Sequence, residues 1–307
     1  MNKSFTLIEI LVVIVVVGIL SSFILVGMSS ITNSANVAKG KAFSNSLRNF
    51  LLMNLVSEWK FEGPTSIDGN VVTTDDTKDS WGGNNVTTVA GSPIVKTSNC
   101  VSGKCVYFDG IDDYLVMADS NSLDITDAIT ISTWVNVSSV QNTNYEYIVR
   151  KTASEPNQGT LYGLLIGYDN RIVRFFIWTE DYAGCQIGAD SLTQLNLNIW
   201  YYLSVTYDYS THTGRIYING ILDNTRTSTT GKIRTNNNSF YISHRQDGTL
   251  FFNGYIDEIV LYNQAMPISG VSENYYSGLN KLFNNNGITL NEYSLRVSEL
   301  KEVLTKQ

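Results

Sequence analysis

Acidic side chains near the expected ends of strands are the residues of this sequence with the clearest capacity for chemistry. Aspartate at such positions commonly accepts hydrogen bonds from its own backbone in a turn. Carboxylate oxygens are also the hard ligands that Ca²⁺ prefers. For any single acid we favour the turn role, and a cation site is the alternative for a group of them. The acids concerned are Glu62, Asp79, Asp109, Asp112, Asp113 and Asp257.

The arrangement of the titratable residues does not favour catalysis. Hydrolysis of a glycosidic bond needs two carboxylates that flank a cleft. In Glu180-Asp181 and Asp257-Glu258 the acids are adjacent, so strand geometry predicts that their side chains point to opposite faces. His212 and His244 lack a partner at metal-ligating spacing, and the motifs of serine hydrolases, zinc proteases and P-loop proteins are absent. We therefore expect a protein that is not an enzyme and holds no organic cofactor.

Composition predicts a folded protein with many strands. The chain has 307 residues, of which 43% are hydrophobic and 16% are charged, whereas disordered chains combine low hydrophobicity with high net charge. The net charge is −7, so there is no basic footprint for a nucleic-acid partner. Abundant tyrosine and phenylalanine, among polar turn residues and only 4 prolines, favour β-structure.

The longest apolar run of the sequence lies near its N-terminus. Residues 10–28 carry no charge, and at about 1.5 Å per residue a helix of this length covers about 28 Å, enough to cross a bilayer core. The run is too long for the apolar region of a secretory signal peptide. Lys3 precedes it, so the positive-inside rule places the N-terminus in the cytoplasm and the rest of the chain outside. Glu9 is costly in lipid, and it either reaches the head groups or has a charged partner.

The residues around Glu9 resemble a known family. Ser4-Phe5-Thr6-Leu7-Ile8-Glu9 and the apolar run after it are similar to the N-termini of type IV pilins and pseudopilins. The resemblance implies that a prepilin peptidase cuts between Ser4 and Phe5 and that the new N-terminal Phe5 is methylated. Glu9 then becomes the fifth residue of the mature chain, where it can neutralise the α-amino group of a neighbouring copy. Residues 31–57 continue with helical spacing as an amphipathic stem.

From residue 58 onward the apolar pattern changes to a period of two. This pattern predicts strands, and Asn219-Gly220 and Asp169-Asn170 predict hairpin turns. No helical segments separate the strands, which argues for an antiparallel sandwich of about 200 residues. The clearest predicted strands are residues 107–108, 114–116, 129–135, 171–178, 200–207, 214–218 and 256–262.

Six segments resemble, in order, the laminin G-like, concanavalin A-like jelly-roll domains of bacterial surface proteins. The segments are residues 58–62, 106–114, 122–135, 198–203, 215–220 and 254–263. The resemblance implies a structural Ca²⁺ that ties the first strand to the last, with Glu62, Asp79, Asn84 and Asp257 at the matching positions. The Glu-x-Asp-x-x-Glu motif of jelly-roll glucanases is absent.

The same resemblance implies binding of glycans or proteins through the loops. Aromatic side chains that could stack on a sugar ring are Tyr145, Tyr147, Trp178 and Tyr182, although aromatic residues on strands more often fill the core.

The cysteines and the C-terminal segment complete the expectations. Cys100 and Cys105 are separated by four residues including a glycine, and outside the membrane such a pair can close a small disulfide loop.

The pattern of residues 272–283 and 293–304 predicts a helical hairpin, with a capping box over residues 289–292. We expect the hairpin to dock on the body or the stem; a partner-binding tail is the alternative.

The predicted fold class is α+β: a long N-terminal membrane and stem helix, an all-β antiparallel jelly-roll sandwich and a short C-terminal helical hairpin. The expected parts are a leader (1–4), a transmembrane and stem helix (5–57), the sandwich (58–265) and a helical segment (266–307).

The expected function is that of a pilin-like subunit whose head binds glycan or another surface ligand. The alternatives are a structural pseudopilin of a type II secretion or DNA-uptake system and a membrane-anchored carbohydrate-active enzyme. The expected partners are its own copies, prepilin peptidase, the assembly machinery and the membrane. The precursor would lie in the inner membrane, with the mature head at the cell surface.

Overall fold

A computed structural model describes residues 52–64, 67–140, 145–152, 160–167, 170–181, 185–227, 231–244 and 250–305. The chain divides into two units, Met1–Met53 and Asn54–Gln307. Ser4, Phe5, Glu9, the apolar run 10–28 and the expected stem up to residue 51 lie outside the described residues. No helix of the described ranges is long and apolar enough to cross a membrane.

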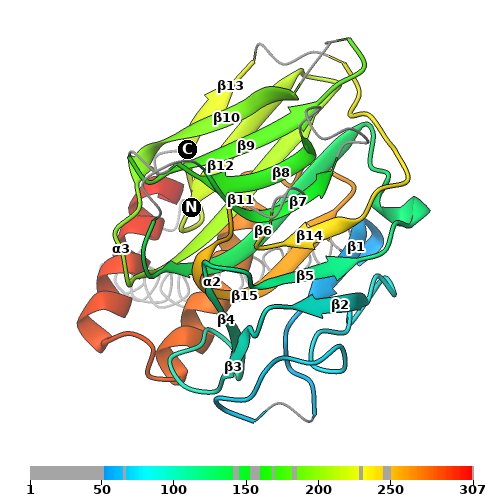
Figure 1. The fold of residues 1–307 in the computed structure, drawn as a ribbon. Helices are drawn as coiled ribbons and strands as arrows, with labels where there is room; N and C mark the ends of the chain where they lie inside the picture. Colours follow the sequence, from blue (N-terminus) through cyan, green and yellow to red (C-terminus); the bar gives the residue numbers. More distant parts are fainter. Residues whose placement is uncertain are drawn as a thin grey trace, which may run out of the picture. The chain divides into compact units, whose positions relative to one another are not determined.

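Two antiparallel sheets make up most of the second unit (Figure 1). The first sheet has the order β13-β12-β11-β6-β15-β4-β3, and β1 pairs with β15 beside this path. Its strands are β1 (Leu55–Trp59), β3 (Ile94–Lys96), β4 (Cys105–Asp109), β6 (Ala128–Val137), β11 (Trp200–Asp208), β12 (Thr213–Ile218), β13 (Ile221–Arg226) and β15 (Asn253–Tyr262). The predicted sandwich is confirmed.

The second sheet has the order β10-β9-β8-β7-β14-β5-β2. Its strands are β2 (Val86–Ala90), β5 (Tyr114–Met117), β7 (Glu146–Thr152), β8 (Thr160–Ile166), β9 (Ile172–Trp178), β10 (Cys185–Gln194) and β14 (Phe240–Ile242). A short 3₁₀ turn, η1 (Asn121–Leu123), precedes β6. Thus sheet neighbours such as β14 and β5 come from distant parts of the chain.

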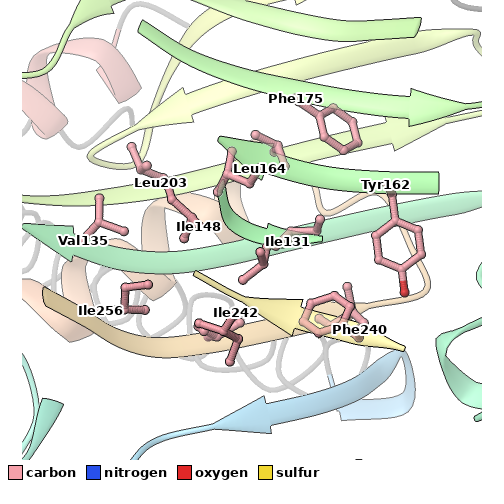
Figure 2. Close-up of a cluster of buried hydrophobic side chains, with 14 of the residues drawn as sticks. Ile131, Val135, Ile148, Tyr162, Leu164, Phe175, Leu203, Phe240, Ile242 and Ile256 are labelled. Atoms are coloured by element: carbon pink, nitrogen blue, oxygen red, sulfur yellow. The ribbon is translucent and has the colours of Figure 1, made fainter. Parts of the chain in front are cut away.

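The core lies between the two sheets, where alternate residues of each strand point inward. Figure 2 shows this packing, with Ile131 and Leu203 of the first sheet facing Ile148 and Phe240 of the second. All of these side chains are fully buried. The period of two read from the sequence therefore predicts strands β6, β9 and β11 correctly.

Two local features differ in how well the sequence predicts them. The predicted turn at Asn219-Gly220 joins β12 to β13, and both residues have positive φ (52° and 75°), as a two-residue hairpin requires.

The expected stem extends too far at its C-terminal end. Residues 55–57 belong to strand β1 because they pair with β15, opposite Tyr262 and Leu261.

A helical hairpin follows the sandwich, as predicted, with somewhat longer helices than expected. The helices are α2 (Ile268–Asn284) and α3 (Leu290–Thr305), shown in orange and red in Figure 1. The amide of Glu292 donates to the hydroxyl of Thr289 (3.2 Å), which is one half of the predicted capping box.

The hairpin docks on the outer face of the first sheet. Trp134 of β6 stacks against Tyr275 of α2, with ring centroids 5.6 Å apart. A Cβ atom on Gly278 would lie 2.5 Å from the indole nitrogen of Trp134, so only glycine permits this approach of helix to sheet. From α3, Arg296 donates to the backbone oxygen of Trp200 (2.8 Å). Of the two expectations for this segment, docking on the body is confirmed.

Candidate functional site

A β-bulge in β15 changes the expected orientation of Asp257 and Glu258. Ile256 and Ile259 both belong to the core although they are three residues apart, and the register of β15 against β6 shifts between Asp257 and Val260. Glu258 has a positive φ of 48°. One extra residue therefore lies between the two core positions, and both acids belong to the outer face. The prediction that adjacent acids point to opposite faces is wrong here.

Asp257 is a fully buried carboxylate with one unpartnered oxygen. Its Oδ2 accepts the amide of Ser102 (2.9 Å), whereas its Oδ1 is buried and has no hydrogen-bond partner. Burial, and then the neighbouring charge of Glu258, raises the pKa of Asp257 well above its usual value. Ser102 lies in a small loop that a disulfide between Cys100 and Cys105 closes. An orphaned buried oxygen of this kind is a position that a cation could satisfy.

Glu62 faces the same disulfide-closed loop. Its Oε1 accepts the amide of Lys104 (3.1 Å), and a Cβ atom on Gly103 would lie 2.4 Å from its Oε2. The charge of Glu62 also contributes to the raised pKa of Asp257. The structure therefore places two of the four predicted calcium ligands around one loop, and their oxygens fit the preference of that ion.

The other two predicted calcium ligands, Asp79 and Asn84, have structural roles. Asp79 accepts the amides of Glu58, Trp81 and Asn84, all at 2.9 Å, so its carboxylate organises the loop that follows. The Asn84 side chain is buried and is bonded to the hydroxyl groups of Ser57, Ser120 and Ser122. Because these oxygens already accept protein donors, they fit a cation less well than those of Glu62 and Asp257.

The acids of the β4–β5 connection act in turns. Asp109 accepts the amide of Ile111 (2.8 Å), and Asp113 accepts the amides of Ser92 (2.5 Å) and Asp109 (2.9 Å). With Asp112 these carboxylates lie within 4.8 Å of one another. Their bonds to backbone amides agree with the turn role that the sequence favoured for single acids.

Two of the four aromatic residues predicted to stack on a ligand are buried within the second sheet. Tyr147 and Trp178 are each only 8% exposed. Tyr145 lies beneath the guanidinium of Arg174, whose carbon is 4.6 Å from the ring centroid. Tyr182 lies outside the described residues. Tyr147 and Trp178 are therefore too buried to offer a ring face to a sugar.

Among the hollows lined by the described residues, two with polar linings were not expected from the sequence. One, of about 450 Å³, lies beside the exposed Trp81 and is also lined by Asn121, Ser122 and Asn263. The other, of about 330 Å³, lies on the outer face of the first sheet. We call the second hollow the sheet groove; it is lined by Asp68, Lys96, Ser98, Asn99, Asn136, Asn198, Trp200 and Tyr255.

The floor of the sheet groove is a row of side chains from neighbouring strands. Asn136 of β6 pairs with Trp200 of β11 on one side and with Tyr255 of β15 on the other, and Tyr255 in turn pairs with Tyr107 of β4. The rings of Tyr107 and Tyr255 have centroids 4.9 Å apart. The sequence signal for this groove was weak, because its residues are far apart in the chain and only the strand register brings them together.

Comparison with protein families identifies both parts of the chain. The model described as the prokaryotic N-terminal methylation motif matches residues 1–25. The model described as the concanavalin A-like lectin/glucanases superfamily matches residues 109–271, just over half of the chain. Both resemblances drawn from the sequence are therefore confirmed. A search of curated proteins finds no match.

Solved structures share the fold at low sequence identity. The binding domain of Paraclostridial mosquitocidal protein 1 matches with a TM-score of 0.54 and 18% identity, over 75% of this chain and 53% of that one. The binding domain of botulinum neurotoxin serotype G matches with a TM-score of 0.55 and 14% identity, over 74% of this chain and 51% of that one.

A third match is one domain of an arabinanase. Domain 4 of the GH43 arabinanase AbnA from Geobacillus stearothermophilus, solved in complex with arabinotriose, has a TM-score of 0.53 and 18% identity, over 72% of this chain and 97% of that domain. The chain thus spans about half the length of the toxin domains and nearly the whole of the arabinanase domain. From the family match over residues 109–271, the chain belongs to the concanavalin A-like lectin/glucanase superfamily.

Proposed function

We propose that this chain is a pilin-like subunit that assembles through its N-terminal segment and displays a glycan-binding head at the cell surface. The observation that carries the proposal is the presence, in one chain, of a prokaryotic methylation motif and a lectin-like domain. The motif supports processing by a prepilin peptidase and insertion in the inner membrane before assembly. The lectin-like domain supports recognition rather than a purely structural role for the head.

Binding is better supported than catalysis. Among the described acids, Asp79, Asp109 and Asp113 are engaged by backbone amides, and Asp257 is fully buried. The matched toxin structures are binding domains, and the arabinanase domain is described in complex with arabinotriose. These similarities support a carbohydrate ligand for the head of this chain.

A structural pseudopilin of a secretion or DNA-uptake system is the second candidate. The methylation motif favours it as much as it favours a pilus subunit, because the resemblance at residues 4–13 is shared by both groups. Long filaments that contain the protein would favour the pilus subunit. A short periplasmic fibre with no glycan affinity would favour the pseudopilin.

Replacing Glu9 with Ala or Gln is expected to leave membrane insertion intact and to reduce the amount of subunit in filaments about tenfold or more. The reason is that the carboxylate would neutralise the α-amino group of a neighbouring copy, and loss of about 1.4 kcal/mol per contact already means a factor of ten. The measurement is quantification of the protein in sheared filaments and in membranes. If both variants are found in filaments in the same amount as the wild type, the role proposed for Glu9 is wrong.

We also propose that the head binds a structural Ca²⁺ through Glu62 and Asp257. The support is the unpartnered, buried Oδ1 of Asp257 beside Glu62 at the disulfide-closed loop. A bound cation would compensate the buried charge of Asp257 and tie β15 to the segment that follows β1.

Adding CaCl₂ at a hundredfold excess over its dissociation constant is expected to raise the melting temperature of the head by about 5–10 °C. Asp257→Asn should abolish this rise and, without calcium, should melt no lower than the wild type, because an amide oxygen can still accept the Ser102 amide and burial already disfavours the charged carboxylate. Asp79→Asn is the matched control and should still respond to calcium. An equal response of the wild type and Asp257→Asn, or no response of the wild type, would contradict the proposal.

A further inference from the structure

The sheet groove is lined by Asn136, whose side-chain oxygen no described protein group satisfies. The Oδ1 atom of Asn136 is buried and has no hydrogen-bond partner. It stands between Trp200 and Tyr255, which pair with Asn136 from the strands on either side. Leaving a buried acceptor unpaired costs free energy that the fold must offset elsewhere. A turn of the Asn136 side-chain amide by 180° would exchange this enclosed oxygen with Nδ2 and present an acceptor to a molecule bound in the groove.

The rim of the groove carries two further amides. Asn99 and Asn198 both have positive φ (58° and 61°), a conformation that asparagine tolerates better than most residues. The backbone oxygen of Asn99 accepts the indole N–H of Trp200 (2.7 Å), and the amide of Asn198 donates to Val137 (2.7 Å). Asn99 also precedes the disulfide-bonded Cys100. These bonds tie both rim segments to strands of the first sheet or their ends.

The lining of the groove favours an uncharged polar ligand. Lys96 contributes one positive charge and Asp68 one negative charge. The lining therefore has no net positive charge that would attract a phosphate or a carboxylate. Each amide offers both a donor and an acceptor, which suits vicinal hydroxyl groups. The half-buried ring of Tyr255 provides an apolar surface beside these amides.

We propose that the sheet groove binds one neutral sugar residue of a glycan, stacked on Tyr255 and hydrogen-bonded by Asn136 with Asn99 and Asn198. This assignment rests on the proposed function, which requires that the head bind glycans, and it adds where they bind and which kind they are. It places the ligand on the outer face of the first sheet, away from the aromatic residues of the second sheet that the sequence suggested. The hollow beside Trp81 is the rival location on the same head.

The test measures binding of the full chain, kept in solution with a detergent that has no sugar head group. The neutral probes are arabinotriose, cellotriose, mannotriose and N,N′,N″-triacetylchitotriose, and the charged probes are 3′-sialyllactose and trigalacturonic acid. Asn136→Ala removes the orphaned amide, and the double variant Asn99→Gly with Asn198→Gly removes the rim amides while glycine keeps the positive φ. Trp81→Ala is the matched control in the other hollow.

We expect the wild type to bind at least one neutral trisaccharide and both groove variants to lose affinity tenfold or more, with Trp81→Ala unchanged. Asn136→Ala should melt no lower than the wild type, which separates loss of binding from loss of folding. Equal binding by the wild type and the groove variants, or binding of charged probes alone, overturns the assignment of this groove and leaves a glycan-binding head in place. Absence of binding to every probe overturns both this assignment and the glycan-binding part of the proposed function.

Discussion

Replacing Lys151 with Met is expected to lower the free energy of unfolding of the head by about 3 kcal/mol. The Lys151 side chain is fully buried in β7, where its ammonium contacts Asp119 and lies 3.2 Å from Asp124. Methionine fills a similar volume but leaves the two carboxylates without their cation. Both acids keep about a quarter of their side-chain surface exposed (24% and 23%), so water compensates part of the loss. Denaturant unfolding of the two proteins measures the difference.

Lys232→Met is the matched control for this prediction. Lys232 pairs with Asp127 at 2.7 Å, a distance typical of a good ion pair, but the two side chains are 43% and 62% exposed. Exposed pairs contribute little to stability, so the unfolding curve should hardly move. If both lysine variants unfold at the same denaturant concentration as the wild type, the ion pairs of Lys151 do not stabilise this fold.

Trp59→Ala is expected to lower the free energy of unfolding by about 3–5 kcal/mol. Trp59 is fully buried in β1, stacks on Phe240 of the second sheet with centroids 5.5 Å apart, and donates its indole N–H to the backbone oxygen of Asn84 (2.8 Å). The truncation would open a cavity between the sheets and release the loop that Asn84 anchors. Thermal or denaturant unfolding measures the effect.

Two further variants separate the contributions at Trp59. Trp59→Phe keeps a ring against Phe240 but leaves the Asn84 carbonyl without its donor, which should cost about 1–3 kcal/mol. Trp81→Ala removes a tryptophan that is 52% exposed and should change stability by less than about 0.5 kcal/mol. A larger loss from Trp81→Ala than from Trp59→Ala would show that the buried tryptophan does not join the sheets as described.

The sequence predicts those features that depend on local pattern. Strands β6, β11 and β12, the Asn219-Gly220 turn and the two C-terminal helices follow from periodicity, turn residues and caps. Only residues 55–57 of β1 fall in the predicted stem, because Leu55 continues the helical spacing of the apolar residues before it. The pairing of β1 with β15, which is a long-range interaction, decides the outcome.

The candidate site depends mainly on long-range pairing and was therefore harder to predict. The bulge at Asp257-Glu258 became visible only from the positions of Ile256 and Ile259 in the core. Asn136 sits beside Trp200 and Tyr255 because of the registers of β6 against β11 and β15, which no local pattern specifies. Asn84 matched a family ligand position, yet its side chain is bonded to serine hydroxyl groups.

The central claim is that this lectin-like domain is carried by a subunit processed and assembled in the manner of a pilin. N-terminal mass spectrometry of the protein recovered from the cell surface tests this claim most directly. We predict a mature chain that begins at a methylated Phe5, after removal of residues 1–4. A surface protein that still begins at Met1 would contradict it and would indicate an anchored head that does not assemble.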